Sequence, residues 1–250
     1  MSDLAGKRAL ITGSSHGIGL AIAQALYAQG CSIVINGRSA ASLARALDTM
    51  PEAIAVVGDV TVPTEAARII AEVSSRLGDL DILICNVGSG KSVAPGKETA
   101  PEWQRVFSVN LWSATNMVEA ATESLSRRAG SIVCISSICG MEVIPGAPVT
   151  YSVAKSALNS YVKGSSRPLA KRNIRINAVA PGNVLFPGST WEEKLKADSG
   201  AVQSMLDAQV AQGRLGAVED IANAVAYLVS DKACFMTGTI MTVDGGQVRG

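Results

Sequence analysis

The strongest constraint on the fold is an alternation that runs through the whole chain, in which short runs of branched apolar residues are followed by longer stretches with helical periodicity. The apolar runs are short and rich in Val and Ile, as buried strands are. They predict strands at residues 8–12, 32–36, 53–57, 82–85, 131–136, 175–179 and 239–243. Strands that alternate with helices are typical of a parallel sheet covered on both faces.

The stretches between these strands predict the helices. Their periodicity places helices at residues 18–28, 39–48, 64–76, 102–124, 152–170 and 218–229. No linker, composition shift or internal repeat interrupts the pattern, and 250 residues with 48% apolar side chains are enough for one large core. We therefore expect residues 1–250 to form a single α/β domain. Residues 183–216 are too long for an ordinary connection, which predicts a substrate-binding loop or, alternatively, an excursion with a helix of its own.

A single histidine, His16, limits the chemistry that the chain can perform. A histidine-based metal site needs at least two, so we expect no metal. A Ser-His-Asp triad would have to use His16 itself, which lies in a glycine-rich stretch. Acid and base groups must therefore come from Tyr, Lys, Asp, Glu or Cys. Five cysteines without a C-x-x-C pair predict reduced thiols in a cytoplasmic protein.

The charge pattern excludes several kinds of partner. There are 22 basic and 21 acidic residues and no basic block, so nucleic acid is not an expected ligand. No apolar stretch reaches the roughly 18 residues of a membrane span, and the first residues do not resemble a secretory signal. We expect a small-molecule ligand instead.

A glycine-rich turn follows the first predicted strand. Gly13, Gly17 and Gly19 lie between an apolar strand and a helical pattern. Glycine permits a tight turn and a close approach of the backbone, and the free N–H groups of a helix N-terminus favour an anion. The position of this turn after the first strand predicts a dinucleotide diphosphate site.

Taken in order, the motifs resemble those of the short-chain dehydrogenases/reductases and, within that family, the 3-oxoacyl-(acyl-carrier-protein) reductases. The resemblance rests on Thr12, Gly13, Gly17 and Gly19, on Asn86-Val87-Gly88, and on Asn110, Ser137, Tyr151, Lys155, Pro181-Gly182 and residues 243–246. It implies a doubly wound sheet of seven parallel strands in the order 3-2-1-4-5-6-7. It also implies that the coenzyme is bound by Gly13, Ser15, His16, Gly17, Ile18, Gly19, Asp59, Val60, Asn86, Gly88, Tyr151, Lys155, Pro181, Gly182 and Val184.

The end of the second strand indicates which nicotinamide coenzyme is bound. An acidic residue there would favour NAD(H), but the sequence has Arg38 and Ser39 instead. A guanidinium and a hydroxyl can bind a 2′-phosphate, which favours NADP(H) and leaves NAD(H) as the alternative. Arg38 could also be an ordinary exposed loop charge.

The resemblance assigns catalysis to four residues. Tyr151 and Lys155 lie one helical turn apart, and a nearby ammonium is expected to lower the pKa of the phenol from about 10. Tyr151 would exchange the proton, Ser137 would orient the substrate carbonyl, and Asn110 would hold a water that links Lys155 to solvent. Ser136 is the neighbouring alternative to Ser137.

These residues imply hydride transfer between nicotinamide and a carbonyl or secondary alcohol, either a 3-oxoacyl thioester or a hydrophobic ketone or alcohol. The expected apolar substrate cleft is lined by Pro187, Trp191, Leu195, Met205 and Leu206. The alternatives are an NAD-dependent polyol or alcohol dehydrogenase of the same family and a non-catalytic dinucleotide sensor. By family analogy, residues 102–124 and 152–170 would pair in a homodimer or homotetramer.

Overall fold

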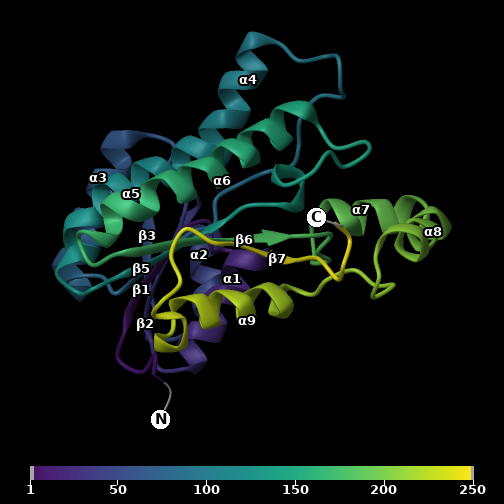
Figure 1. The fold of residues 1–250 in the computed structure, drawn as a ribbon. Helices are drawn as coiled ribbons and strands as arrows, with labels where there is room; N and C mark the ends of the chain where they lie inside the picture. The colour runs from purple at the N-terminus through teal and green to yellow at the C-terminus, as the bar shows by residue number, and fades with distance from the viewer. Residues whose placement is uncertain (1–2, 249–250) are drawn as a thin grey trace.

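One parallel sheet organises the molecule (Figure 1). The computed structural model describes residues 3–248. Its strands lie in the order β3-β2-β1-β4-β5-β6-β7, all parallel. They are β1 (Arg8–Ile11), β2 (Ser32–Gly37), β3 (Ile54–Val57), β4 (Ile82–Cys85), β5 (Ser131–Ile135), β6 (Arg175–Pro181) and β7 (Ile240–Val243). The predicted fold class and strand order are confirmed.

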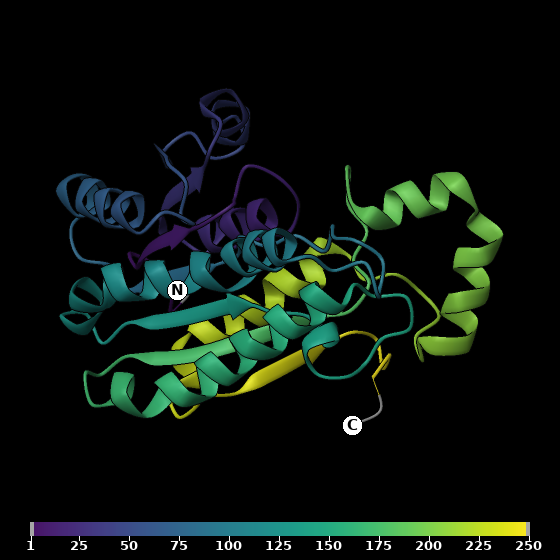
Figure 2. The same cartoon turned by 90° about the horizontal axis from the view of Figure 1, so that it is seen from above.

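Helices cover both faces of this sheet (Figures 1 and 2). One face carries α1 (Gly17–Ala28), α2 (Ala40–Leu47) and α9 (Val218–Val229). The other carries α3 (Pro63–Leu77), α5 (Ser113–Ser126) and α6 (Val149–Ala170), with α4 (Ala100–Phe107) beyond them. Two short 3₁₀ helices, Ile138–Gly140 and Asp231–Ala233, lie in connections.

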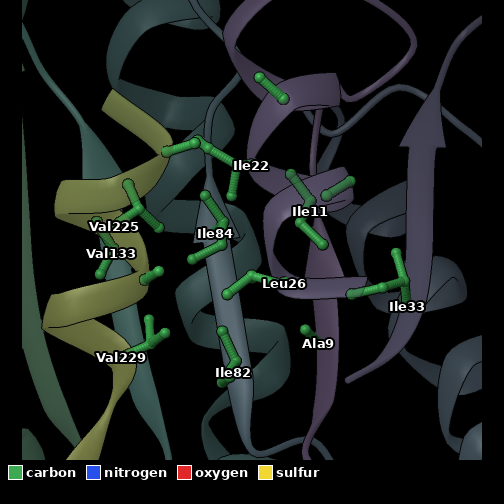
Figure 3. Close-up of a cluster of buried hydrophobic side chains, with 14 of the residues drawn as sticks. Ala9, Ile11, Ile22, Leu26, Ile33, Ile82, Ile84, Val133, Val225 and Val229 are labelled. Carbon is green, nitrogen blue, oxygen red and sulfur yellow. The ribbon is translucent and has the colours of Figure 1, made fainter. Parts of the chain in front are cut away.

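The core forms because each strand is apolar on both sides. Figure 3 shows the layer between the sheet and α1 and α9, where Ile11 and Ile84 of adjacent strands meet Ile22 and Val225 of the two helices. All four side chains are almost completely buried. Burying a side chain of this size contributes roughly 1.5–3 kcal/mol. The sheet is therefore held rigidly between its helices, and its carboxyl edge is a fixed base for a site.

The helix predicted at residues 102–124 is interrupted. Helix α4 ends at Phe107, a π-helical turn spans Ser108–Trp112, and α5 begins at Ser113. A π turn accommodates one residue more than an α turn and is frequent at functional sites. It brings Asn110 to the inner side of the bundle, where its side chain is 1% exposed.

The long segment after β6 contains two helices, α7 (Thr190–Ala197) and α8 (Ser199–Gln209). Ser189 caps α7 by accepting a hydrogen bond from the Glu192 N–H at 3.1 Å, and Asp198 caps α8 through the Ala201 N–H at 2.8 Å. Both helices project beyond the carboxyl ends of the strands, where the chain folds back over that edge (Figure 2). The alternative of a helical excursion therefore describes this segment better than a loop.

Candidate active site

A cleft of about 1030 Å³ opens at the carboxyl edge of the sheet. Its walls come from the turns after β1, β2, β3, β4, β5 and β6 and from α6, α7 and α8. The site residues expected from the sequence that line it are Gly13, Ser15, His16, Gly17, Ile18, Gly19, Arg38, Ser39, Asp59, Val60, Asn86, Gly88, Ser137, Tyr151, Lys155, Pro181, Gly182 and Val184. Of the residues expected to act in catalysis or coenzyme binding, Asn110 alone does not line the cleft.

The glycine turn after β1 is fixed by Asn86. The Asn86 side chain donates hydrogen bonds to the carbonyls of Thr12 and Gly13, at 3.0 and 2.9 Å. Gly13 has a φ of +62°, and a Cβ there would lie 2.9 Å from Val87 Cγ2. Any larger residue would thus be strained and would collide with the neighbouring turn. The turn at the start of α1 therefore lines the cleft with backbone atoms at its glycines.

Ser137, Tyr151 and Lys155 converge at the opposite end of the cleft. Ser137 follows β5, its hydroxyl hydrogen-bonds with the Tyr151 phenol, and Tyr151 is in the first turn of α6. Lys155 Nζ lies 5.9 Å from the centre of the Tyr151 ring and donates a hydrogen bond to the Ile135 carbonyl at 2.8 Å. Lys155 is 2% exposed. A phenol, a hydroxyl and a buried ammonium therefore face one small volume.

Burial dominates the protonation of this group. It raises the pKa of Tyr151 to about 12, against a smaller lowering by the Ser137 hydrogen bond, and it lowers the pKa of Lys155 to about 8. The expected lowering of the tyrosine pKa by the lysine is therefore wrong for this structure. The ammonium lies 5.9 Å from the ring centre and is directed to a backbone carbonyl, while the phenol loses solvent. At neutral pH Tyr151 carries its proton and is a proton donor.

Asn110 lies outside the cleft and is hydrogen-bonded to the loop that lines it. Its Oδ1 accepts a hydrogen bond from the Ser89 N–H at 2.9 Å, and its Nδ2 donates to the carbonyls of Ser89 and Val106, at 3.1 and 3.0 Å. A Cβ on Gly88 would lie 3.1 Å from Asn110 Oδ1 and 3.0 Å from Lys155 Nζ. The amide thus ties the π turn to the loop after β4, beside the lysine.

The structure also distinguishes the two neighbouring serines after β5. The Ser136 hydroxyl donates a hydrogen bond to Asn159 Oδ1 at 2.6 Å. The Ser137 hydroxyl contacts Tyr151 and accepts the Cys139 N–H at 3.2 Å. Ser136 therefore fixes α6 to the sheet, and Ser137 is the serine beside the phenol.

Comparison with known proteins places this geometry in a family. A family model described as enoyl-(acyl carrier protein) reductase matches residues 13–247. An uncharacterized oxidoreductase of Methylorubrum extorquens is 36% identical over 98% of this chain and 99% of its own length, and a 3-oxoacyl-(acyl-carrier-protein) reductase of Staphylococcus aureus is 33% identical over 96% and 97%. The crystal structure of L-sorbose reductase from Gluconobacter frateurii, complexed with NADPH and L-sorbose, superposes with a TM-score of 0.92 at 31% identity over 98% of both chains.

The chain belongs to the short-chain dehydrogenase/reductase family. The predicted resemblance is confirmed, and the protein is an enzyme of this family. In the described residues, 3–248, this dehydrogenase/reductase has no helix long and apolar enough to cross a membrane. The same residues contain no group of three His, Cys, Asp or Glu side chains placed to hold a metal ion.

The far end of the cleft in this dehydrogenase/reductase carries Arg38, Ser39 and Asp59. Arg38 is 81% exposed and lies 4.0 Å from Asp59, and the Ser39 hydroxyl caps α2 through the Ser42 N–H. Burial acts to raise the pKa of Asp59, but hydrogen bonds from Thr61 and the charge of Arg38 lower it overall. This end of the cleft therefore presents an exposed guanidinium in a long ion pair with an ionised carboxylate.

Val184 lies beside the middle of the cleft, after β6. Hydrogen bonds of 2.9 Å from the Leu185 N–H to the Gly216 carbonyl and of 2.8 Å from the Gly216 N–H to the Asn183 carbonyl hold it in a parallel bridge. Neither bond uses the N–H or C=O of Val184 itself. Its backbone groups are therefore left for another partner.

The expected apolar cleft wall is only partly correct. Trp191 and Met205 line the cleft, but Pro187, Leu195 and Leu206 do not. Leu206 is 5% exposed in a small core between α7 and α8, and Leu195 packs against it, because the two helices bury these side chains against each other.

Sequence reasoning missed several cleft residues, among them Phe186, Cys139 and Lys194. The Phe186 ring is so close to Gly17 that a Cβ there would lie 2.7 Å from it. The signal available for Cys139 was its position two residues after Ser137. No local signal marked Lys194, which is one of several alternating charges in α7.

Proposed function

We propose that this enzyme uses NADP(H) to transfer hydride between the nicotinamide and a carbonyl or secondary alcohol of a small molecule. The observation that carries the proposal is the convergence of Ser137, Tyr151 and Lys155 in the same cleft as the open glycine turn. A proton donor and an orienting hydroxyl beside a nucleotide-sized cleft meet the chemical needs of carbonyl reduction. The S. aureus relative is named as a reductase of 3-oxoacyl groups, and the solved L-sorbose reductase contains NADPH.

The shape of the cleft fits a dinucleotide. The backbone of the glycine turn can bind a diphosphate because Gly13, Gly17 and Gly19 line the cleft without side chains of their own. The exposed Arg38 guanidinium and the Ser39 hydroxyl at the far end supply donors for a 2′-phosphate, so NADP(H) fits better than NAD(H). The coenzyme would also be bound by Asn86, Asp59 and Val184, which lie in the connections that follow β4, β3 and β6.

Residues of this chain supply the remaining steps. The bound coenzyme provides or accepts the hydride. Tyr151, protonated at neutral pH, donates its proton to the substrate oxygen during reduction, and Ser137 orients that oxygen by a hydrogen bond. Lys155 keeps a positive charge near the phenol as the proton leaves, and its hydrogen bond to Ile135 fixes its position. Asn110, bound to Ser89 beside this lysine, positions the path by which the proton is replaced.

We further propose a single catalytic domain over residues 1–250, a cytoplasmic location and a homodimer or homotetramer. Trp112, between α4 and α5, and Val153 on α6 support the assembly, because their side chains are 44% and 42% exposed. Large apolar side chains exposed on neighbouring helices favour a subunit interface. Light scattering of the purified enzyme tests this, and a monomer at micromolar concentration would contradict it.

The decisive experiment measures oxidation of NADPH and of NADH with a panel of carbonyls: a 3-oxoacyl thioester, a hydrophobic ketone and a keto-sugar. We expect turnover of at least one substrate with a higher kcat/KM for NADPH. The keto-sugar arm tests the polyol alternative, for which the L-sorbose reductase likeness is the supporting observation. Coenzyme binding without any turnover would support the dinucleotide sensor and contradict the proposal.

A further inference from the structure

Helix α7 forms part of the wall of the cleft. This helix carries four charged residues. Three of them form ion pairs: Glu193 pairs with Lys91 at 3.1 Å, and Lys196 pairs with Glu192 at 3.0 Å. The fourth, Lys194, has no carboxylate within 4.0 Å among the residues that the structure describes.

Lys194 is held on the cleft side of the helix. Its ammonium lies 4.3 Å from the centre of the Trp191 ring, and both side chains line the cleft. A cation above an aromatic face is stabilised while it remains free to bind an anion on its other side. The Trp191 ring thus presents the ammonium to the substrate volume.

The ammonium is also close to the reacting end of that volume. Burial raises the pKa of the Cys139 thiol, and the positive charges of Lys155 and Lys194 both act to lower it. The Cys139 N–H donates a hydrogen bond to the Ser137 hydroxyl at 3.2 Å. A substrate oxygen bound by Ser137 would therefore lie in a volume lined by two ammonium groups, the buried Lys155 and the exposed Lys194.

Nothing at this end of the cleft neutralises the charge. The cleft contains one carboxylate in the described chain, Asp59, and it lies beside Arg38 at the adenosine end. Arg105, which also lines the cleft, is bound by Glu102 and by the Lys91 carbonyl. An excess of positive charge in a partly enclosed site favours an anionic ligand.

We infer that Lys194 is a specificity-determining residue that selects carbonyl substrates with an anionic group, a carboxylate or a phosphate, a few atoms from the reacting carbonyl. The inference deepens the proposed function and rests on it. An anionic substrate differs from the hydrophobic ketone that the sequence predicts. The sequence of α7 does not show which of its four charged residues lacks a carboxylate partner and faces the cleft.

The test uses substrate pairs that differ in charge but little in shape. Acetoacetate is compared with its methyl ester, and dihydroxyacetone phosphate with dihydroxyacetone, in the wild type and in Lys194→Gln. We expect the wild type to prefer one anion over its neutral partner by about tenfold in kcat/KM, and Lys194→Gln to remove most of that preference through KM, with kcat retained. The two pairs distinguish a carboxylate from a phosphate.

Two variants serve as controls. Lys196→Gln removes a charge from the same helix, outside the cleft, and should keep the preference for the anionic substrate. Lys194→Arg, which keeps a positive charge at this position, should keep that preference as well. Equal use of anionic and neutral partners by the wild type, or an equal loss for both in Lys194→Gln, overturns the inference but not the proposed function. Absence of turnover with every carbonyl overturns the proposed function. In that case calorimetric titration of the NADPH-loaded wild type with the same pairs still tests the inference, and equal affinity for both partners overturns it.

Discussion

The two edges of the sheet each carry a cavity lined by charged residues. The cavities differ in whether those charged groups are bonded to other groups of the protein. At the amino edge, a cavity of about 560 Å³ is lined by the residues that begin β4, β5 and β6. There Asp81 accepts hydrogen bonds from Arg128 and from the Arg8 N–H, and Arg175 donates to the carbonyls of Leu228, Ser230 and Met236. At the carboxyl edge, Tyr151, Lys155 and Lys194 have no carboxylate partner in the described chain.

This difference teaches that a cavity alone does not mark a site. Asp81 and Arg175 at the amino edge are hydrogen-bonded within the protein and stabilise its fold, so they are not available to a ligand. At the carboxyl edge, Lys155 is buried without a carboxylate partner in the described chain, which costs stability, while the exposed Lys194 faces the cleft unpaired, so both are left for a ligand. Substitutions should therefore affect activity at one edge and stability at the other.

The largest effect is expected for Tyr151→Phe at the carboxyl edge. Loss of the phenolic proton should lower kcat by about 10³-fold, within the range for a general acid, and leave the Kd for NADPH unchanged. Steady-state kinetics and fluorescence titration measure the two quantities. Tyr161→Phe, on the same helix but outside the cleft, is the matched control and should retain activity. Full activity of Tyr151→Phe would contradict the assignment.

Lys155→Met should abolish activity and yet stabilise the coenzyme-free protein. The pKa of Lys155 is about 8 in the folded protein, below the 10.5 of a free lysine, so at pH 7 folding must bury a charge. Between pH 8 and 10.5 the unfolded chain keeps a proton that the folded chain has released, so the wild type gains stability as pH rises. The advantage of Lys155→Met should therefore shrink by about 3 kcal/mol over this range.

Urea unfolding at pH 7 and pH 10 measures this change. The control is Lys163→Met, which removes an exposed lysine from the same helix and should give the same stability difference at both pH values. A difference for Lys155→Met that does not depend on pH would show that the ammonium is solvated in the folded protein.

At the amino edge, Asp81→Ala should lower the free energy of unfolding and leave kcat per folded molecule unchanged. The Asp81 side chain is 4% exposed, and its loss strands the Arg8 N–H and frees Arg128, which is 42% exposed. We expect about 2 kcal/mol, less than for a fully buried pair because water solvates Arg128 once it is free. Asp79→Ala, which breaks a more exposed pair with Arg127, should cost under about 1 kcal/mol.

An effect smaller than that of Asp81→Ala is expected at the adenosine end, where the Arg38 side chain is 81% exposed. Arg38→Ala should raise the Kd for NADPH about tenfold and leave the Kd for NADH unchanged, because one charge-assisted contact to a phosphate is lost. Arg45→Ala, on α2 outside the cleft, is the control. An equal effect on both coenzymes would remove Arg38 from the 2′-phosphate site.

Much of the fold could be predicted from the sequence, because a buried parallel strand is a run of apolar residues whatever segments lie beside it. The strand predicted at residues 8–12 is Arg8–Ile11, and the one predicted at 82–85 is Ile82–Cys85. The motif residues from Gly13 to Val184 also reach one cleft, since parallel strands end at the same edge. Their catalytic roles remain predictions until they are tested by substitution.

What could not be predicted depends on contacts between distant segments. The pKa of Tyr151 rises because of burial that is invisible in the spacing of Tyr151 and Lys155. Leu195 and Leu206 look like cleft residues until α7 and α8 pack against each other. The pairing of Glu193 with Lys91, 102 positions away, is what leaves Lys194 as the free charge of its helix.

The π turn at Ser108–Trp112 has a consequence for how this chain tolerates changes in length. It holds one residue more than a continuous α-helix would need. Deleting a single residue there would restore regular backbone hydrogen bonds and leave the helices on both sides in register, because the turn already absorbs the extra residue. It would, however, shift Asn110 within the turn, and its amide would then leave Ser89. Making the helix regular at this point would therefore damage the enzyme, so the extra residue of the π turn has to be kept.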